Sequence, residues 1–325
     1  MNIKEFINCL MRQLTPCFEK QRNADTFTLL FDSFINEMGT ANSWSKATYS
    51  KLLNLKHHVV EYDGDVCLEI IDETWLIGFV EYCLDQEMCN TTIQNLLCML
   101  RWFMNWALKH HHVRQTEWMS FKPKLKTVRG KIVFLTWDEL MRVTNLEFGS
   151  DEQQLEYVRD LFCLECFTGL RYSDIQGLKP CQISDSTIEI VTKKTADHLS
   201  IELNTYSRWL LEKYRGRWAD HVMPQVTIQW MNRRIKEVCR RAGVTEVLQK
   251  VWYEGSERYE VSKAKWELVS SHCGRRTFVC NSLAMGITPE TVMKWTGHSS
   301  YKSMKPYIDV ADDVKRAAMH KWDER

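Results

Sequence analysis

The sequence has few of the features that mark disordered, fibrous or membrane proteins. Its 325 residues include only 13 glycines and 6 prolines, fewer than a disordered or fibrous chain would carry. No apolar run approaches the roughly 18 residues that a membrane-spanning helix needs. An acidic residue, Glu5, stands where a signal peptide would begin its basic and apolar segments. These absences indicate a folded protein of the cytoplasm.

Motifs for nucleotide and metal chemistry are also missing. Neither GxGxxG nor GxxxxGK[ST] occurs, so no phosphate-binding loop is visible for nucleotide hydrolysis. The 12 cysteines are scattered and many stand in apolar helical runs, which is typical of reduced, buried thiols. The one CxxC motif, Cys163 to Cys166, lacks a second pair, so a buried helical turn explains it better than a metal site.

The charge is balanced overall but unevenly distributed. A net charge of +1 by itself argues against a nucleic-acid-binding protein. However, residues 61–87 contain nine acidic and no basic residues, whereas residues 109–131 contain seven basic residues and one acid. This pattern fits a protein that faces a polyanion from one side, and two solvated surface faces are the alternative.

The hydrophobic pattern predicts a mainly helical chain with two domains. We expect a short helix over residues 1–22, a helical domain over 23–113, a basic linker over 114–134 and a second domain over 135–325. Thr136 and Glu139 have the spacing of a capping box at the start of the second domain. Residues 186–203 alternate around a polar turn, which predicts a β-hairpin. The expected fold class is therefore mainly α with a small β-hairpin (α+β).

The second domain contains short motifs with groups that can act on a phosphodiester. They are Thr168-Gly169-Leu170-Arg171, His272 with Arg275, Gly297-His298, and Tyr307. Two guanidiniums can clamp the non-bridging oxygens of a phosphodiester and stabilise the charge of phosphoryl transfer. A tyrosine hydroxyl can attack phosphorus if a base takes its proton and an acid protonates the leaving oxygen.

Local signals predict how the chain presents these groups. Gly169 is expected to end one helix, and Ser173 is expected to cap the next, which places Arg171 at the junction. His298 is expected on a turn, because Gly297 follows the last helical residues. Pro306 is expected to break the preceding helix, which would leave Tyr307 free to move.

The order and spacing of these motifs resemble the tyrosine recombinases, also called the phage integrase family. The N-terminal half, with the segment from Asn90 to Ala107, looks like the core-binding domain of that family. The resemblance implies a helical DNA-binding domain joined by a linker to a catalytic domain, the two closing on double-stranded DNA. It also implies chemistry that needs no metal, ATP or other cofactor.

The resemblance assigns a role to each matching residue. Arg171 and Arg275 would bind the scissile phosphate, and His298 would hydrogen-bond it. Tyr307 would be the nucleophile that forms a 3′-phosphotyrosyl link, and His272 would accept or share its proton. Nearby Tyr301 is a competing phenol, but Tyr307 has the family's distance from Gly297-His298.

Two further positions support these groups in the family. Lys194 matches the hairpin lysine that protonates the 5′-oxygen, although its neighbour Lys193 is an alternative. Asp174 fits the acidic residue that orients the first arginine.

Other basic residues are expected to contact DNA, with a solvated face as the alternative. In the linker they are Lys122, Lys124, Lys126, Arg129 and Lys131. On a helix that begins near Thr227 they are Arg233, Arg234, Lys236, Arg240 and Arg241.

The sequence thus predicts a site-specific recombinase that integrates, excises or inverts a mobile element. Four protomers would act on inverted half-sites, and a C-terminal helix over Asp312 to Lys321 would dock into a neighbouring copy. One rival is a catalytically silent DNA-binding protein that keeps the fold. The other is a type IB topoisomerase-like enzyme, which shares the chemistry without pairing two DNA sites.

Overall fold

The structure, a computed structural model, describes residues 26–310, which divide into two compact units. The first contains the described residues up to Arg129 together with Val251–Glu260, and the second contains the rest. The helices predicted over 1–22 and from Asp312 to Lys321 lie outside the described residues. None of the described helices is both long and apolar enough to cross a membrane.

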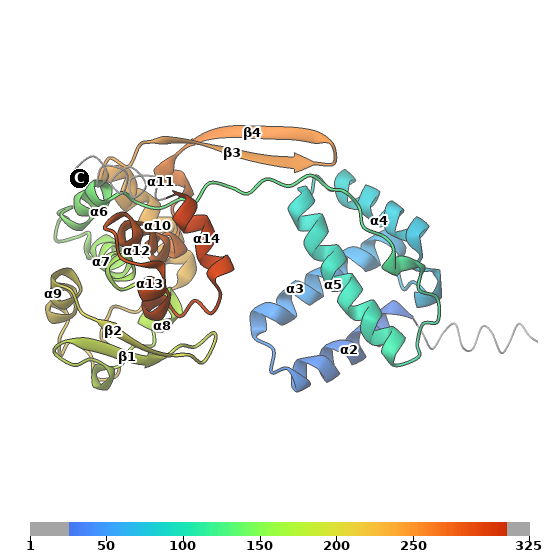
Figure 1. The fold of residues 1–325 in the computed structure, drawn as a ribbon, viewed down its shortest axis with the longest axis horizontal. Helices are drawn as coiled ribbons and strands as arrows, with labels where there is room; N and C mark the ends of the chain where they lie inside the picture. Colours follow the sequence, from blue (N-terminus) through green and yellow to red (C-terminus); the bar gives the residue numbers. More distant parts are fainter. Residues whose placement is uncertain (1–25, 311–325) are drawn as a thin grey trace, which may run out of the picture. The chain divides into compact units, whose positions relative to one another are not determined.

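The first unit is a group of helices around an aromatic core (Figure 1). Its elements are α2 (Phe27–Ala41), α3 (Lys46–Asp63), the short 3₁₀ helix η1 (Leu68–Ile70), α4 (Glu73–Asp85), α5 (Asn90–Lys109) and the 3₁₀ helix η2 (Glu117–Met119). The rings of Phe27, Phe31 and Phe103 contact one another at centroid distances of 4.9 to 5.3 Å. Ser45 and Asp72 cap α3 and α4 by accepting backbone N–H groups, which fixes where these helices begin.

Asn90, at the start of α5, joins three separate segments within the first unit. Its side-chain amide donates to the carbonyl oxygens of Lys126 (2.9 Å) and Gly255 (2.8 Å), and its oxygen accepts the Gly255 N–H (2.7 Å). Only 1% of Asn90 is exposed, so these bonds form away from water, where leaving them unmade would be costly. The linker and the Val251–Glu260 segment are thereby held at the N-terminal end of α5.

The linker after α5 contains no helix except η2, and its basic side chains reach solvent. Lys122, Lys124, Lys126, Arg129 and Lys131 are all exposed. An exposed row of like charges without regular structure is available to a polyanion.

The second unit packs its helices around the buried helix α7 (Figure 1). Its elements are α6 (Trp137–Thr144), α7 (Gln153–Thr168), α8 (Tyr172–Ile175), η3 (Pro180–Gln182), β1 (Thr187–Val191), β2 (His198–Glu202), α9 (Thr205–Lys213), α10 (Ile228–Arg241), α11 (Lys265–Leu268), α12 (Ser271–Ala284), α13 (Pro289–Thr296) and α14 (Tyr301–Val310). The strands β3 (Val247–Glu254) and β4 (Glu257–Ala264) belong to both units, because their shared segment Val251–Glu260 is part of the first. All of α7 from Val158 to Thr168 is buried, because α6, α9, α10 and α12 cover it. The predicted capping box of Thr136 and Glu139 begins α6.

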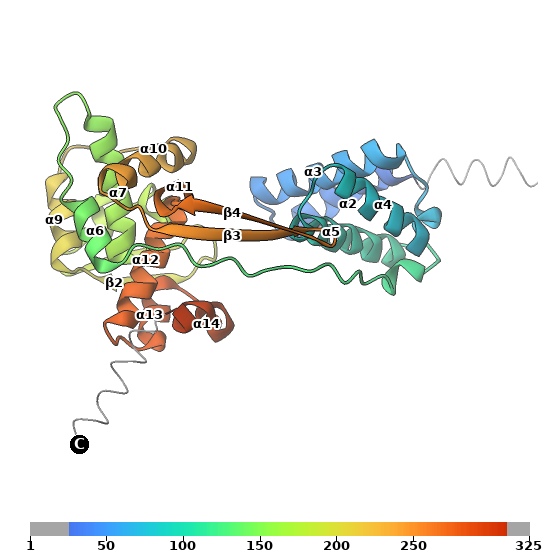
Figure 2. The same cartoon turned by 90° about the horizontal axis from the view of Figure 1, so that it is seen from above.

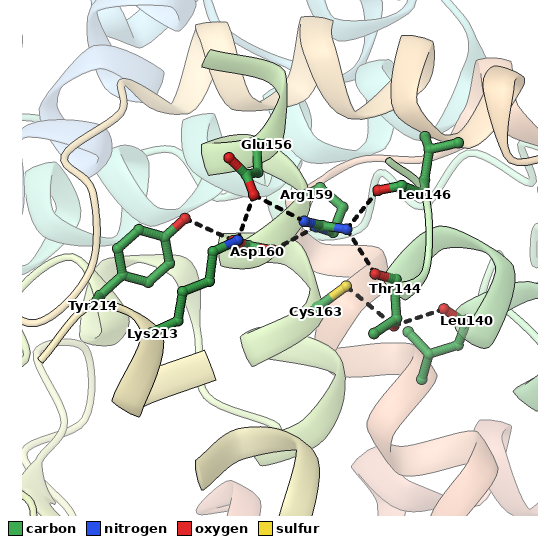
Figure 3. A network of polar contacts seen from close by, with 9 residues as sticks. All are labelled: Leu140, Thr144, Leu146, Glu156, Arg159, Asp160, Cys163, Lys213 and Tyr214. Atoms are coloured by element: carbon green, nitrogen blue, oxygen red, sulfur yellow. Dashed lines mark hydrogen bonds and ion pairs between the residues drawn. The ribbon is translucent and has the colours of Figure 1, made fainter. Parts of the chain in front are cut away.

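Buried charges fix the first half of α7 (Figure 3). Asp160 accepts hydrogen bonds from Lys213 Nζ and Tyr214 Oη, each at 2.6 Å, and pairs with Arg159. Arg159 also donates to the carbonyl oxygens of Thr144 (2.6 Å) and Leu146 (2.8 Å). Because a buried charge is tolerated only when it is paired and hydrogen-bonded, this network allows little movement of α7 against α9 and the end of α6.

The predicted hairpin is formed by β1 and β2, and a second hairpin was not anticipated. In the first, Ile188 pairs with Ile201 and Ile190 with Leu199, so one face is apolar and buried. Figures 1 and 2 show β3 and β4 as a long two-stranded ribbon, whose turn contains Gly255 at φ +59°. The sequence signal was present, because β-branched and aromatic residues flank the Gly255-Ser256 pair.

Candidate active site

The first arginine lies at the turn between α7 and α8. Gly169 ends α7 with φ +70°, and a Cβ atom there would lie 2.5 Å from Phe278 Cδ1, so only glycine fits. Arg171 occupies the N-cap position of α8, and the prediction that Ser173 caps this helix is wrong. The chain turns directly after buried Leu170, so α8 begins earlier than expected.

Asp174 lies beneath Arg171 and connects it with the hairpin. Arg171 Nη1 is 3.9 Å from Asp174 Oδ2, and Asp174 Oδ1 accepts the backbone N–H of Lys193 at 3.0 Å. Among the described residues, the buried Nη1 of Arg171 has no hydrogen-bond partner. A half-buried guanidinium with an unused donor is suited to bind an oxyanion.

The second arginine holds the ends of two helices together. Arg275, 3% exposed, donates from Nη1 to the carbonyl oxygen of Gly169 at 2.8 Å and from Nη2 to that of Thr296. Burial, and then the charge on Arg171, lower the pKa of Arg275 to about 10. The two cations repel each other, so an anion between them would be strongly favoured.

His298 follows the left-handed Gly297 on a turn, as predicted. The Thr296 hydroxyl donates to the Val292 carbonyl oxygen (2.6 Å) and lies 2.7 Å from His298 Nδ1. Since that hydroxyl proton is already used, Nδ1 must carry the hydrogen of a neutral ring, which leaves Nε2 as an acceptor. Burial, followed by the charges of Arg275 and Arg171, lowers the pKa of His298 to about 4.

His272 precedes Arg275 by one helical turn on α12. Partial burial of the ring is the main cause that lowers its pKa to about 4, and the charges on Arg276 and Arg275 add to it. Arg171 and Lys194 are further cations that act on this ring. His272 is therefore neutral near pH 7 and able to accept a proton.

Tyr307 lies inside α14, not beyond a helix break. The expectation that Pro306 interrupts this helix is wrong, because α14 continues through it to Val310. Proline removes one backbone hydrogen bond, but burial of Met304 against Val279 and Val292 holds the helix in place. Tyr307 is half-buried, and its ring lies 6.3 Å from the ring of His298, centroid to centroid.

The two candidate tyrosines and the two candidate hairpin lysines differ in their surroundings. Tyr301 is 54% exposed at the start of α14, whereas Tyr307 packs against the small apolar cluster around Met304. The Lys193 side chain lies over Gly177, where a Cβ atom would be 2.3 Å from its Nζ. Lys194 is exposed, and its charge reaches His272.

Of the predicted catalytic residues, Arg171, His272 and Arg275 line one pocket of about 240 Å³, whereas Lys194, His298 and Tyr307 are not among its lining residues. Its walls are Glu165, Leu170, Arg171, Tyr172, Ser173, Ser271, His272 and Arg275. Sequence reasoning overlooked two residues here, Thr296 and Glu165. Both are buried polar residues, and Glu165 could have been noticed as a charge within the otherwise apolar end of α7.

The basic residues of α10, which were expected to contact DNA, differ in how free their charges are. Arg240 and Arg241 both pair with Glu237, and Arg241 also pairs with Glu152. The guanidinium of Arg234 stacks on Trp230 at 4.3 Å, whereas Arg233 is exposed and Lys236 is half-buried.

Comparisons with known proteins agree with this architecture. Residues 26–124 match the family model of the phage integrase SAM-like domain. Lambda integrase (residues 75–356), solved as a dimer bound to a COC′ core site, superposes with a TM-score of 0.68 at 14% identity, covering 87% of this chain and 95% of that one. The chain has the tyrosine recombinase fold. No curated protein matches the sequence.

Two further recombinase structures extend the match. The Tn1549 transposon integrase in complex with a circular intermediate DNA has a TM-score of 0.66 at 14% identity, covering 90% of this chain and 98% of that one. A lambda integrase tetramer bound to a Holliday junction has a TM-score of 0.65 at 14% identity, covering 94% and 85%. The resemblance to the tyrosine recombinases and the α+β fold class predicted from the sequence are thereby confirmed.

The two histidines make the stability of this protein depend on pH. Folding keeps both rings neutral down to about pH 4, whereas an unfolded chain protonates histidine near pH 6.5. The unfolded state therefore binds more protons in this window, so the free energy of unfolding falls as the pH drops from 6.5 to 4. Above pH 6.5 these two rings contribute no pH dependence.

Ring NMR and denaturant unfolding across this pH range would measure the effect. His298→Gln should reduce the pH dependence, because only His272 then contributes, whereas His198→Gln, at an exposed position on β2, should leave it unchanged. Titration of both active-site rings near pH 6.5 would contradict the proposed environment.

Proposed function

We propose that this chain is a site-specific DNA recombinase that cleaves and rejoins DNA through a 3′-phosphotyrosyl intermediate. The observation that carries the proposal is the convergence of Arg171, Arg275 and His272 on one pocket, with Tyr307 beside His298. Two guanidiniums, one with an unpaired buried donor, provide charge stabilisation for phosphoryl transfer.

In the proposed mechanism, Arg171 and Arg275 bind the non-bridging oxygens of the scissile phosphate. The Tyr307 oxygen attacks phosphorus and the bond to the 5′-oxygen breaks, so one phosphodiester replaces another. Neutral His272 accepts the tyrosine proton, and the phosphate charge raises the pKa of His298 until its Nε2–H donates to the phosphate. Lys194 protonates the departing 5′-oxygen.

The substrate in this proposal is double-stranded DNA of a mobile element or phage genome in the cytoplasm. The exposed linker lysines and arginines and the basic face of α10, including Arg233 and Lys236, would contact its phosphates. The proposed domains remain a helical DNA-binding domain over 23–113, a linker over 114–134 and a catalytic domain over 135–325.

A covalent adduct with DNA would identify the nucleophile. Incubating the protein with a nicked duplex that carries its native flanking repeat should yield an SDS-resistant covalent adduct in the presence of EDTA. Tyr307→Phe should abolish the adduct and Tyr301→Phe should retain it. Specific binding without any adduct would favour a silent DNA-binding protein, and relaxation of plasmids lacking the site would favour the topoisomerase-like rival.

Cleavage rates of two variants distinguish the roles of the two hairpin lysines. Lys194→Ala should slow cleavage by roughly 10²-fold or more, the usual contribution of a general acid, whereas Lys193→Ala should have little effect. A substrate with sulfur in place of the bridging 5′-oxygen should restore cleavage by Lys194→Ala, because a thiolate leaves without protonation. Failure of that substrate to restore cleavage would remove Lys194 from the role of acid.

We further infer that four protomers assemble on inverted half-sites through their C-terminal segments. The second unit has an apolar groove of about 340 Å³, lined in part by Trp137, Phe167, Tyr206, Phe278, Met285 and Trp295. The 15 residues after Val310 supply Val314, Ala317, Ala318 and Met319 as apolar side chains of matching character. The lambda integrase neighbours are a dimer on a core site and a tetramer on a Holliday junction, which supports such an assembly.

Paired variants test this assembly. Deleting residues 311–325 and Met285→Glu should each preserve DNA binding and single-site cleavage but reduce recombination between two sites. Trp209→Glu, an exposed apolar position on α9, is the control. Full recombination by the truncated protein would exclude the segment, and loss of single-site cleavage would indicate that the segment acts within its own protomer.

A further inference from the structure

A buried glutamate borders the pocket that contains the two arginines. Glu165 lies on α7, one turn before Gly169, and only 1% of it is exposed. It shares the pocket of about 240 Å³ with Arg171 and Arg275. The motifs that identify the proposed catalytic groups do not include it, so its presence needs a separate explanation.

Glu165 contacts the first residue of α12. Its Oε1 accepts a hydrogen bond from the Ser271 hydroxyl at 2.8 Å, and the Ser271 backbone N–H donates to Asn232 Oδ1 of α10 at 2.8 Å. Ser271 directly precedes His272 and lies one turn before Arg275. The bond therefore connects the end of α7, which presents Arg171, with the start of α12.

The backbone of α12 approaches Glu165 closely. A Cβ atom on Gly274 would lie 2.6 Å from Glu165 Cβ and 2.7 Å from Oε2. Gly274 thus leaves the space that the carboxyl group fills, and a displacement of either helix would disrupt this fit.

No cation compensates a negative charge on this carboxyl group within the described part of the chain. Oε2 is buried without a hydrogen-bond partner, and Oε1 has only the neutral Ser271 hydroxyl. Glu139, another buried glutamate, instead receives Lys265 Nζ at 2.7 Å. Burial without a counter-ion raises the pKa of Glu165 well above its usual value.

We propose that Glu165 is a positioning residue: as an uncharged carboxylic acid it ties the start of α12 to the end of α7 and so sets His272 and Arg275 against Arg171. The inference rests on the proposed recombinase function, because its main consequence is read in DNA cleavage. An ionised Glu165 would leave an unpaired charge in the core and would reduce the net positive charge of the pocket that is proposed to bind the DNA phosphate.

The groups around Glu165 define what its ionisation would change. Arg171 and Tyr172 face the pocket from α8, and His272 and Arg275 face it from α12. Burial, and then the charge on Glu165, raise the pKa of Tyr172. Cys166, the next residue on α7 after Glu165, is also buried. Asn232 of α10, which contacts Ser271, does not titrate. A rise in pH that ionises Glu165 would therefore weaken cleavage.

Cleavage of the nicked duplex by a series of variants tests the proposal. Glu165→Gln keeps a neutral group that accepts from Ser271, so it should stay within about twofold of the wild type near pH 7. Glu165→Ala and Ser271→Ala remove the tie and should slow cleavage by about tenfold or more, as small displacements of reacting groups do. At alkaline pH, Glu165→Gln should retain cleavage where the wild type loses it.

A carboxyl-specific measurement distinguishes this role from simple packing. ¹³C NMR of labelled glutamate side chains should show one protonated carboxyl group at pH 7 that is missing in Glu165→Gln. Glu139→Gln is the matched control: it removes a charge that faces Lys265, so it should lower the melting temperature, whereas Glu165→Gln should not.

Two outcomes would overturn the proposal. One is an ionised Glu165 at pH 7, and the other is a Glu165→Gln variant that is as slow as Glu165→Ala or follows the wild-type pH profile. Ser271→Ala tests the same hydrogen bond if Glu165→Ala does not fold. If the wild type forms no adduct, the proposed function fails, but the NMR and melting measurements still decide the state of Glu165.

Discussion

The site depends on one buried guanidinium and the two carbonyl oxygens that it binds. Arg275 donates to Gly169 at the end of α7 and to Thr296 at the end of α13. Carbonyls at helix C-termini lack intrahelical partners and carry partial negative charge, so a cation there satisfies both needs. Each helix then ends in a left-handed glycine, followed closely by Arg171 in one case and His298 in the other. One side chain thereby sets the positions of two others.

The same contacts explain the electrostatic character of the pocket. The charge on Arg171 lowers the pKa of Arg275, and both arginines lower the pKa of the neighbouring histidines. Asp174 Oδ2 lies 3.9 Å from Arg171 Nη1, and Asp174 Oδ1 accepts a hydrogen bond from the hairpin backbone. The pocket therefore has excess positive charge, which is the kind of preorganised charge that the proposed phosphoryl transfer needs in its transition state.

Local signals in the sequence predicted the parts of the site that depend on local backbone geometry. Each of these signals specifies a turn or an element over a few residues: the glycines at 169 and 297, the Thr136 capping box and the alternation around 186–203. Contacts between distant segments were not readable in this way. The bonds from Arg275 to Gly169 and from Glu165 to Ser271 each span 106 residues in sequence, and the packing of α7 against α12 brings those partners together.

Pro306 shows how tertiary packing outweighs a local rule, and it changes how motion of the nucleophile must be described. A proline normally ends a helix, but α14 is anchored by buried Met304 one turn before Tyr307. Tyr307 is therefore not on a free segment. Because the residues 298–300 before α14 lie outside any helix, movement of Tyr307 toward phosphorus would carry α14 as a unit about that turn. Such movement would also change the contact between the rings of Tyr307 and His298, which couples the position of the nucleophile to a residue proposed to bind the phosphate.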